Sequence, residues 1–338
     1  MSSDCIRLIV VAVTLLLSDV TCQTVHNISI SHDVRSGRQR GQAEPLTQAV
    51  KSAAVDHHNA LRALEGAANM EIMVWNEDVA SRASSWALQC KEGHQEPRQD
   101  GQNIADGGNP KNLAPKINKW YNEKAHYTLE THTCRKWPCG HYTQVVWAHS
   151  RYVGCVVSRC PYNRRTTCNY SPEGNTNKGM TRPYRKGPAC SKCPNGAGWC
   201  KNKLCNWQCT RAGEGCSCAA ICYNCATLDL GTCRCKCAKG WRGVDCTVRC
   251  KDTHKWCGKS PGWPYKSLCN VVKNIKVDCP AFCGVCEVDP DATEGLCPPV
   301  RGPAADSAQT MFIKSHQSTM IFVIMVIIAF TIISYDAL

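Results

Sequence analysis

Apolar residues recur at helical spacing in three stretches of the chain. The first runs over residues 50–64 and predicts a helix that carries His58. Two more helices are predicted at 78–90 and at 112–127. Residues 153–159 are short, apolar and rich in β-branched side chains, which is typical of a strand that crosses a core. This mixture of helices and short strands predicts an α+β protein, arranged as an α-β-α sandwich.

Both ends of the chain carry apolar runs of another kind. Residues 8–17 follow Arg7 and precede small residues, so residues 1–22 are predicted to be a secretory signal peptide. The hydrophobic tail at 320–338 follows a polar spacer and the small-residue stretch that starts at Asp306. That layout favours a GPI signal with the lipid on Asp306 over a single transmembrane helix. We therefore expect a secreted or surface-anchored extracellular protein, with membrane contact through its C-terminus.

Cysteine content supports the same compartment. The chain has 28 cysteines in 338 residues, and removal of Cys5 and Cys22 with the signal peptide leaves an even number. After residue 184 no apolar periodicity is long enough for a core, so small disulfide-rich modules are predicted. The net charge of +13 favours anionic partners such as acidic glycans or phospholipid headgroups. An extracellular protein, glycan or lipid is the expected partner, and nucleic acid is not.

Residues 23–45 are polar and contain an R-x-x-R stretch that ends at Arg38. They are either a flexible, disordered leader or a propeptide that is cut after Arg38 or Arg40. Asn27 begins one N-x-S glycan acceptor, and Asn169 begins a second.

Three short motifs resemble the signatures of one family. They are G-H-Y-T-Q-V-V-W at 140–147, V-G-C at 153–155 and C-N-Y-S-P-E-G-N at 168–175. Together they resemble the CAP superfamily, which includes the cysteine-rich secretory proteins, antigen 5 and pathogenesis-related 1. The resemblance implies a CAP domain (also called SCP) at 46–183 with an α-β-α sandwich and a central cleft. It does not name a reaction.

The resemblance extends to the cysteines. In the CAP domain it implies the bridges Cys90–Cys160, Cys134–Cys139 and Cys155–Cys168. Residues 184–210 resemble the hinge of cysteine-rich secretory proteins, which implies Cys190–Cys200 and Cys193–Cys205.

Two further modules are expected after the hinge. Residues 211–247 resemble an EGF-like module with a final bridge Cys237–Cys246, and they lack the acidic lead-in of calcium-binding forms. Residues 250–286 resemble a ShK-like module, which implies Cys250–Cys286, Cys257–Cys279 and Cys269–Cys283. Residues 287–319 are predicted to be a stalk, whose Cys297 requires an upstream partner such as Cys209. The pairing of the cysteines from Cys209 to Cys235 stays open.

The candidate site also follows from the resemblance. His58 begins H-N-A-L-R and His141 lies in G-H-Y-T-Q, and these two are implied to face the cleft, where they can hold Zn²⁺. The family completes a tetrad with acidic residues in W-x-x-E and G-E-N motifs. Here the matching positions are Asp78 and Gln102. Two histidines hydrogen-bonded in a polar cleft without a metal are the alternative.

Three functions follow, and the first is favoured: a binding protein that uses the cleft and the C-terminal modules. The second is a metal-dependent endoprotease, which is disfavoured because Gln102 cannot ionise to act as a general base. Ser150 is the hydroxyl that a proteolytic mechanism would use, and it is a poor candidate because it more often satisfies backbone groups. The third is ion-channel modulation, although the segment between Cys269 and Cys279 lacks the Lys-Tyr pair of channel-blocking toxins.

Overall fold

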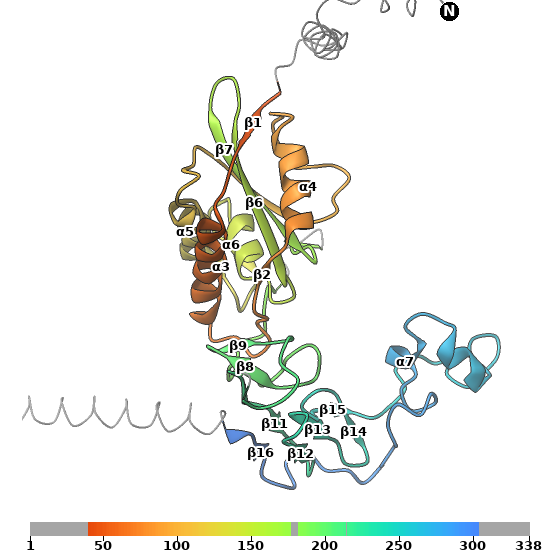
Figure 1. Ribbon diagram of the computed structural model, residues 1–338. Coiled ribbons are helices and arrows are strands. Elements are labelled where there is room, and N and C mark those ends of the chain that lie inside the picture. The colour runs from red at the N-terminus through yellow and green to blue at the C-terminus, as the bar shows by residue number, and fades with distance from the viewer. Residues whose placement is uncertain (1–39, 177–181, 214, 304–338) are drawn as a thin grey trace, which may run out of the picture. The chain divides into compact units, whose positions relative to one another are not determined.

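The computed structural model describes residues 40–176, 182–213 and 215–303. Its largest sheet has the strand order β1-β6-β7-β3, with β2 added in parallel beside β6 (Figure 1). The other neighbours in this sheet are antiparallel. The strands are β1 (Gln42–Glu44), β2 (Val74–Trp75), β3 (Gly101–Asp106), β6 (Tyr152–Arg159) and β7 (Arg164–Ser171).

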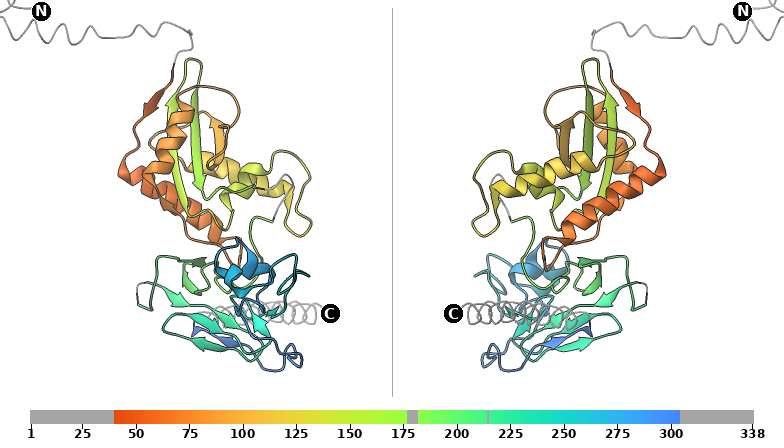
Figure 2. Two further views of the ribbon diagram at one scale, coloured as in Figure 1. Left: turned by 90° about the vertical axis from the view of Figure 1, so that its right-hand side faces the viewer. Right: turned by 90° about the vertical axis from the view of Figure 1, so that its left-hand side faces the viewer.

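Helices cover both faces of this sheet, as Figure 2 shows. Helix α4 (Glu77–Ala87) packs on one face, and α3 (Gln48–Ala63), α5 (Ala114–Tyr121) and α6 (Gly140–Val145) pack on the other. A 3₁₀ turn, η1 (Asn122–His126), extends α5. The short hairpin β4 (Tyr127–Thr128) and β5 (Thr133–Cys134) follows. The predicted α-β-α sandwich is confirmed, and α6 is a helix that the apolar pattern does not predict.

Strand β6 shows why the sandwich has two layers of helices. Its side chains alternate, so that Val156 packs with α4 while Val153 and Val157 enter the main core. Gly154 faces α4 so closely that an added Cβ would overlap the backbone nitrogen of Ala80. Because no side chain stands there, α4 lies directly against the strand.

The three CAP-domain disulfides implied by the resemblance are present in the structure. Cys90–Cys160 joins the end of α4 to the end of β6, and Cys155–Cys168 crosses between paired residues of β6 and β7.

The hinge segment is attached to the sandwich by backbone hydrogen bonds. Ile72 N donates to Cys205 O at 2.9 Å, and Cys205 N donates to Met70 O at 2.7 Å. The segment folds as a small sheet of β8 (Trp199–Lys201), β9 (Leu204–Cys205) and β10 (Ser217–Cys218). Both hinge bridges implied by the resemblance are present.

The region that follows the hinge consists of two-stranded ribbons held by disulfides. Strand β12 (Thr227–Asp229) pairs with β13 (Arg234–Lys236), and β14 (Trp241–Arg242) pairs with β15 (Val248–Arg249). The bridge Cys237–Cys246 is present. The connectivity that the sequence leaves open is Cys209–Cys216, Cys218–Cys233 and Cys222–Cys235.

Residues 287–303 correct the predicted stalk. Strand β16 (Val300–Arg301) returns to pair with β11 (Ile221–Cys222), and Cys297 is bonded to Cys225 rather than to Cys209. Strand pairing and a disulfide therefore hold this segment against the preceding module. The module at 250–286 contains η2 (Lys266–Asn270) and α7 (Ile275–Asp278), and its three expected bridges are present.

Several predictions lie outside the described residues. These are the signal peptide, the leader up to residue 39, the Asn27 acceptor, the Asp306 anchor and the hydrophobic tail. Within the described ranges, no helix combines the length and the hydropathy that a bilayer span requires.

Candidate functional site

A pocket of about 200 Å³ opens beside one end of the sandwich and has two histidines in its wall. His94 comes from the loop after α4, and His141 comes from the start of α6. Residues of β3 form another wall, and Arg165 of β7 completes it. The site is thus assembled from segments that are distant in the sequence.

His141 is held by the carboxylate of Glu123, a residue that was not among the predicted site residues. Its Nδ1 donates to Glu123 Oε1 at 2.6 Å, and its backbone N–H donates to Glu123 Oε2 at 3.1 Å. Trp120 stacks against the ring with centroids 6.3 Å apart. Because Nδ1 carries the donated hydrogen, the lone pair of Nε2 is left for another partner.

His94 is held in the same way by Gln102. Its Nδ1 lies 3.2 Å from Gln102 Oε1, which also accepts from Gln95 N at 3.2 Å. The amide Nε2 of Gln102 donates to Asn169 Oδ1 at 3.0 Å, and these contacts fix the amide orientation. Partial desolvation lowers the pKa of His94, which favours the neutral ring, and its Nε2 is left as a lone-pair donor.

The two histidines offer the donor type that a borderline metal such as zinc takes. Imidazole nitrogens bind zinc, and both rings are oriented through Nδ1. Where a second acidic group is expected, the chain has the neutral amide of Gln102. The set therefore supplies less negative charge than two histidines with two carboxylates.

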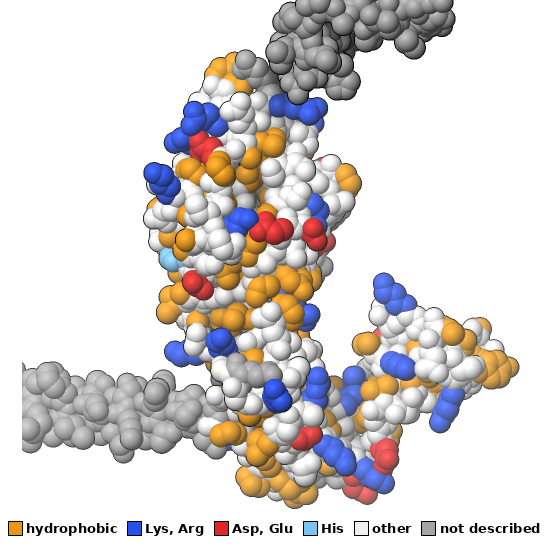
Figure 3. Space-filling view, viewed as in Figure 1, with side chains coloured by type: hydrophobic (Ala, Val, Ile, Leu, Met, Phe, Trp, Pro, Cys, Tyr) orange, Lys and Arg blue, Asp and Glu red, His pale blue; other side chains and the backbone are white. Residues whose placement is uncertain are grey.

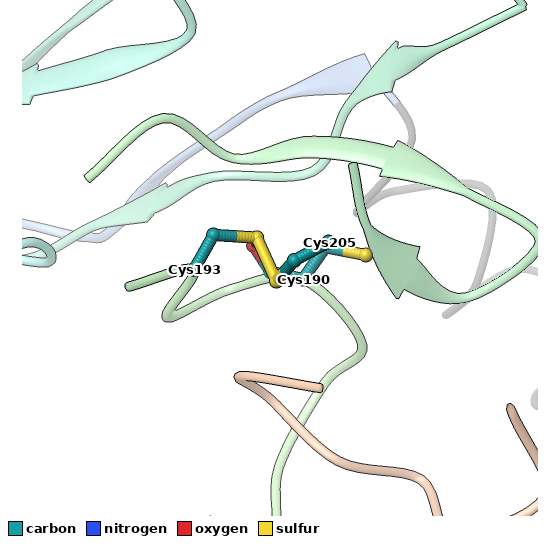
Figure 4. Close-up of side chains that lie close together, drawn as sticks. All are labelled: Cys190, Cys193 and Cys205. Atoms are coloured by element: carbon teal, nitrogen blue, oxygen red, sulfur yellow. A yellow bond between two sulfur atoms is a disulfide. The ribbon is translucent and has the colours of Figure 1, made fainter. Parts of the chain in front are cut away.

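One other group of potential ligands is close together within the described part of the chain. The sulfur atoms of Cys190, Cys193 and Cys205 lie within 4.8 Å of one another (Figure 4). All three are committed to disulfides, Cys190–Cys200 and Cys193–Cys205, so no thiolate is left to bind a metal.

The prediction that His58 is a cleft ligand is wrong. Its side chain is fully buried, Nδ1 is bonded to Ala54 O at 2.8 Å, and Nε2 lies 3.0 Å from the hydroxyl of Tyr170. Burial lowers its pKa to about 4. Both ring nitrogens are occupied, so His58 joins α3 to β7 and does not line the pocket of His141.

The prediction that Asp78 lies in the cleft is also wrong. It is exposed in the first turn of α4, away from the residues that line the pocket. Trp120-Tyr-Asn-Glu123 matches W-x-x-E, whereas the stretch at 75–78 ends in Asp, and the carboxylate of Glu123 is the one that reaches His141. This exact match is the sequence signal for Glu123, whereas His94 carries no comparable pattern. Gln102 stands where it was predicted, beside the pocket.

Two other candidates have structural roles. Ser150 is fully buried, and its hydroxyl donates to Pro172 O at 2.9 Å and accepts from Gln144 Nε2 at 3.1 Å. Asn169 is 1% exposed, and its side-chain nitrogen donates to Asp100 at 3.2 Å. The predicted glycan on Asn169 is therefore incompatible with the folded domain.

Comparison with known proteins identifies the fold family. Residues 55–170 match the family described as the cysteine-rich secretory protein family, CAP. The cysteine-rich venom protein Mr30 of Conus marmoreus is 32% identical over 270 residues, which cover 72% of this chain and 83% of that protein. Peptidase inhibitor 16 of Homo sapiens is 39% identical over 180 residues, 49% of this chain and 38% of that protein.

Solved structures show the same similarity over the N-terminal part. The crystal structure of NaASP2 with Zn²⁺ is 25% identical, has a TM-score of 0.39, and is matched over 47% of this chain and 96% of its own. The Schistosoma mansoni venom allergen-like protein 4 is 26% identical with a TM-score of 0.36, over 42% of this chain and 97% of its own. By its motifs, its disulfides, the family match and its similarity to Mr30, the chain belongs to the CAP family of cysteine-rich secretory proteins.

Proposed function

We propose that the protein is an extracellular binding protein whose CAP pocket takes a divalent cation, zinc being the best match to the donors. The observation that carries this proposal is that His94 and His141 line the same pocket, each oriented through Nδ1 and each with Nε2 left for a ligand. Disulfides throughout the described chain support an oxidising, extracellular compartment. A protein, glycan or lipid is the partner that we expect for the molecule as a whole.

His94 and His141 would hold the metal, and Glu123 and Gln102 would orient them. A bound zinc ion supplies a Lewis acid that polarises an oxygen ligand. Hydrolysis additionally needs a group that can remove a proton from water. Gln102 has no such group, and Glu123 is engaged by His141 through both carboxylate oxygens. Binding is therefore favoured over the alternative function, metal-dependent proteolysis.

Zinc titration by calorimetry on the purified, fully oxidised protein tests the pocket. We expect binding to be lost in His94→Ala and in His141→Ala, and to weaken about 10–100-fold in Glu123→Gln, because the orienting carboxylate is removed. Gln102→Glu should strengthen binding, since it adds a negative charge beside His94.

The matched control is His149→Ala, which removes an exposed histidine outside the pocket. It should leave zinc binding unchanged. Failure of the wild-type protein to bind zinc, or an equal loss in His149→Ala, would overturn the metal site.

A further inference from the structure

The three-disulfide module, residues 250–286, has a small core that leaves apolar side chains outside. Its buried centre is formed by Ile275 and the bridged Cys269 and Cys279. Val271 and Val277, close to this core in sequence, are 76% and 61% exposed. Scattered exposed valines are common in proteins, so their surroundings decide whether they matter.

Those surroundings are cationic. The module has six lysines and two aspartates, a net charge of +4, and it contains no arginine. Within the described part of the chain, none of the six lysines forms an ion pair. Asp252 is engaged in accepting from the backbone N–H groups of Ala281 and Phe282. The lysines are Lys251, Lys255, Lys259, Lys266, Lys273 and Lys276.

The valines and lysines share one short segment. Residues 271–274 connect η2 to α7, and the segment 271–277 continues into α7. Lys276 Nζ donates to Asn270 Oδ1 at 3.2 Å across this connection. Asn274, at φ 68°, turns the chain between the two elements. Along this segment the exposed residues are Val271, Lys273, Asn274, Lys276 and Val277. Figure 3 shows Lys side chains and apolar side chains interspersed on the surface of the module.

We propose that this module docks on a membrane surface that contains anionic phospholipid, with the segment 271–277 facing the headgroups. Lysines near such a surface are each attracted by its negative potential, and apolar side chains between them can enter the headgroup boundary. Protein–protein interfaces are enriched in arginine and depleted in lysine. The module has the opposite composition, with six lysines and no arginine. Unpaired lysines with exposed valines therefore favour a lipid surface over a protein partner.

The test is vesicle co-sedimentation of the protein ending at residue 303. This form retains all of the described disulfides, from Cys90–Cys160 to Cys225–Cys297, and it leaves out the apolar tail at 320–338 so that the tail cannot contribute to binding. We expect binding to phosphatidylserine–phosphatidylcholine vesicles, little binding to phosphatidylcholine alone, and weakening with salt. The Lys273→Glu/Lys276→Glu variant should bind more than about tenfold more weakly. Val271→Asn/Val277→Asn should lose about tenfold without any change in charge.

The control for charge is Lys201→Glu/Lys203→Glu, which makes the same change on the exposed β8–β9 turn of the hinge. It should retain nearly all of the binding. Equal losses in the two charge variants would show nonspecific attraction of a basic protein and overturn the proposal. The same conclusion follows if the valine variant binds normally, or if the protein does not bind anionic vesicles at low salt. Circular dichroism of each variant verifies that the fold is intact.

Discussion

Arg62 is a cation in the centre of the CAP domain, and it forms no ion pair among the residues that the structure describes. Its side chain is fully buried on α3. It donates to five backbone carbonyl oxygens, those of Glu71, Val145, Trp147, Ala148 and Ser150. Burial lowers the pKa of Arg62 to about 9, so the guanidinium is still protonated at neutral pH. One side chain therefore satisfies the carbonyl groups of the turn that follows α6.

Arg62→Met should be one of the most damaging single substitutions in the domain. It leaves five carbonyl groups without this donor, and we expect the free energy of unfolding to fall by about 3–5 kcal/mol. Arg98→Met removes an exposed arginine that pairs with exposed Glu96 and should stay within about 0.5 kcal/mol of wild type. Denaturant unfolding measures both. Similar values for the two variants would contradict the role of Arg62.

His58 should make stability depend on pH. Its pKa is lowered from 6.5 to about 4 by burial, so the unfolded chain takes up a proton between these values while the folded protein does not. The contribution of the neutral His58 to the free energy of unfolding is fully present above about pH 6.5. It falls by roughly 3 kcal/mol as the pH is lowered towards 4.

A buried variant without a titrating ring, His58→Gln, should flatten this part of the curve. Comparison of wild type and variant in denaturant at several pH values isolates the contribution, because other groups titrate in both. If the two curves run parallel from pH 7 to pH 4, His58 is not the source.

At the scale of elements, the sequence predicts the parts of the fold that local patterns control. Periodicity finds α3, α4 and β6, since each has an apolar face of the correct period. Periodicity does not predict the short helix α6, because α6 is buried on most sides and lacks an exposed polar face that would reveal a helical period. The pocket is harder to predict: Gln102 is found from its motif, but His94 lies in a loop and Glu123 in η1, and the tertiary fold brings both to the pocket of His141.

The contact between α4 and β6 can be tested at Gly154. A methyl group there would overlap the backbone of Ala80, which cannot rotate away as a side chain can. We expect Gly154→Ala to cost about 3 kcal/mol of unfolding free energy, through displacement of α4. Gly140→Ala is the matched control, because the nearest atom to its added Cβ is 4.0 Å away. A Gly154→Ala protein as stable as this control would show that the helix can move without cost.

For the whole molecule, the central question is whether the C-terminal region and the CAP domain unfold together. The Cys225–Cys297 bridge closes the longest loop among the described disulfides, with a sequence separation of 72 residues. It holds β16 against β11, where Gly302 N also donates to Ala220 O at 2.8 Å. From the loss of chain entropy in the unfolded state, a bridge that closes a loop of this length is expected to stabilise the folded protein by about 4 kcal/mol.

The Cys225→Ser/Cys297→Ser variant should release the β11–β16 pair and leave the CAP domain intact, because the sandwich has its own core and its own three disulfides. Hydrogen exchange measured by mass spectrometry should show faster exchange at 220–222 and 300–302, with β6 and β7 unchanged. Zinc binding should also be unchanged, since none of the pocket residues lies near this bridge in the chain. Faster exchange in β6 and β7 would instead mean that folding of the sandwich depends on closure of the C-terminal loop, and the molecule would then be one cooperative unit.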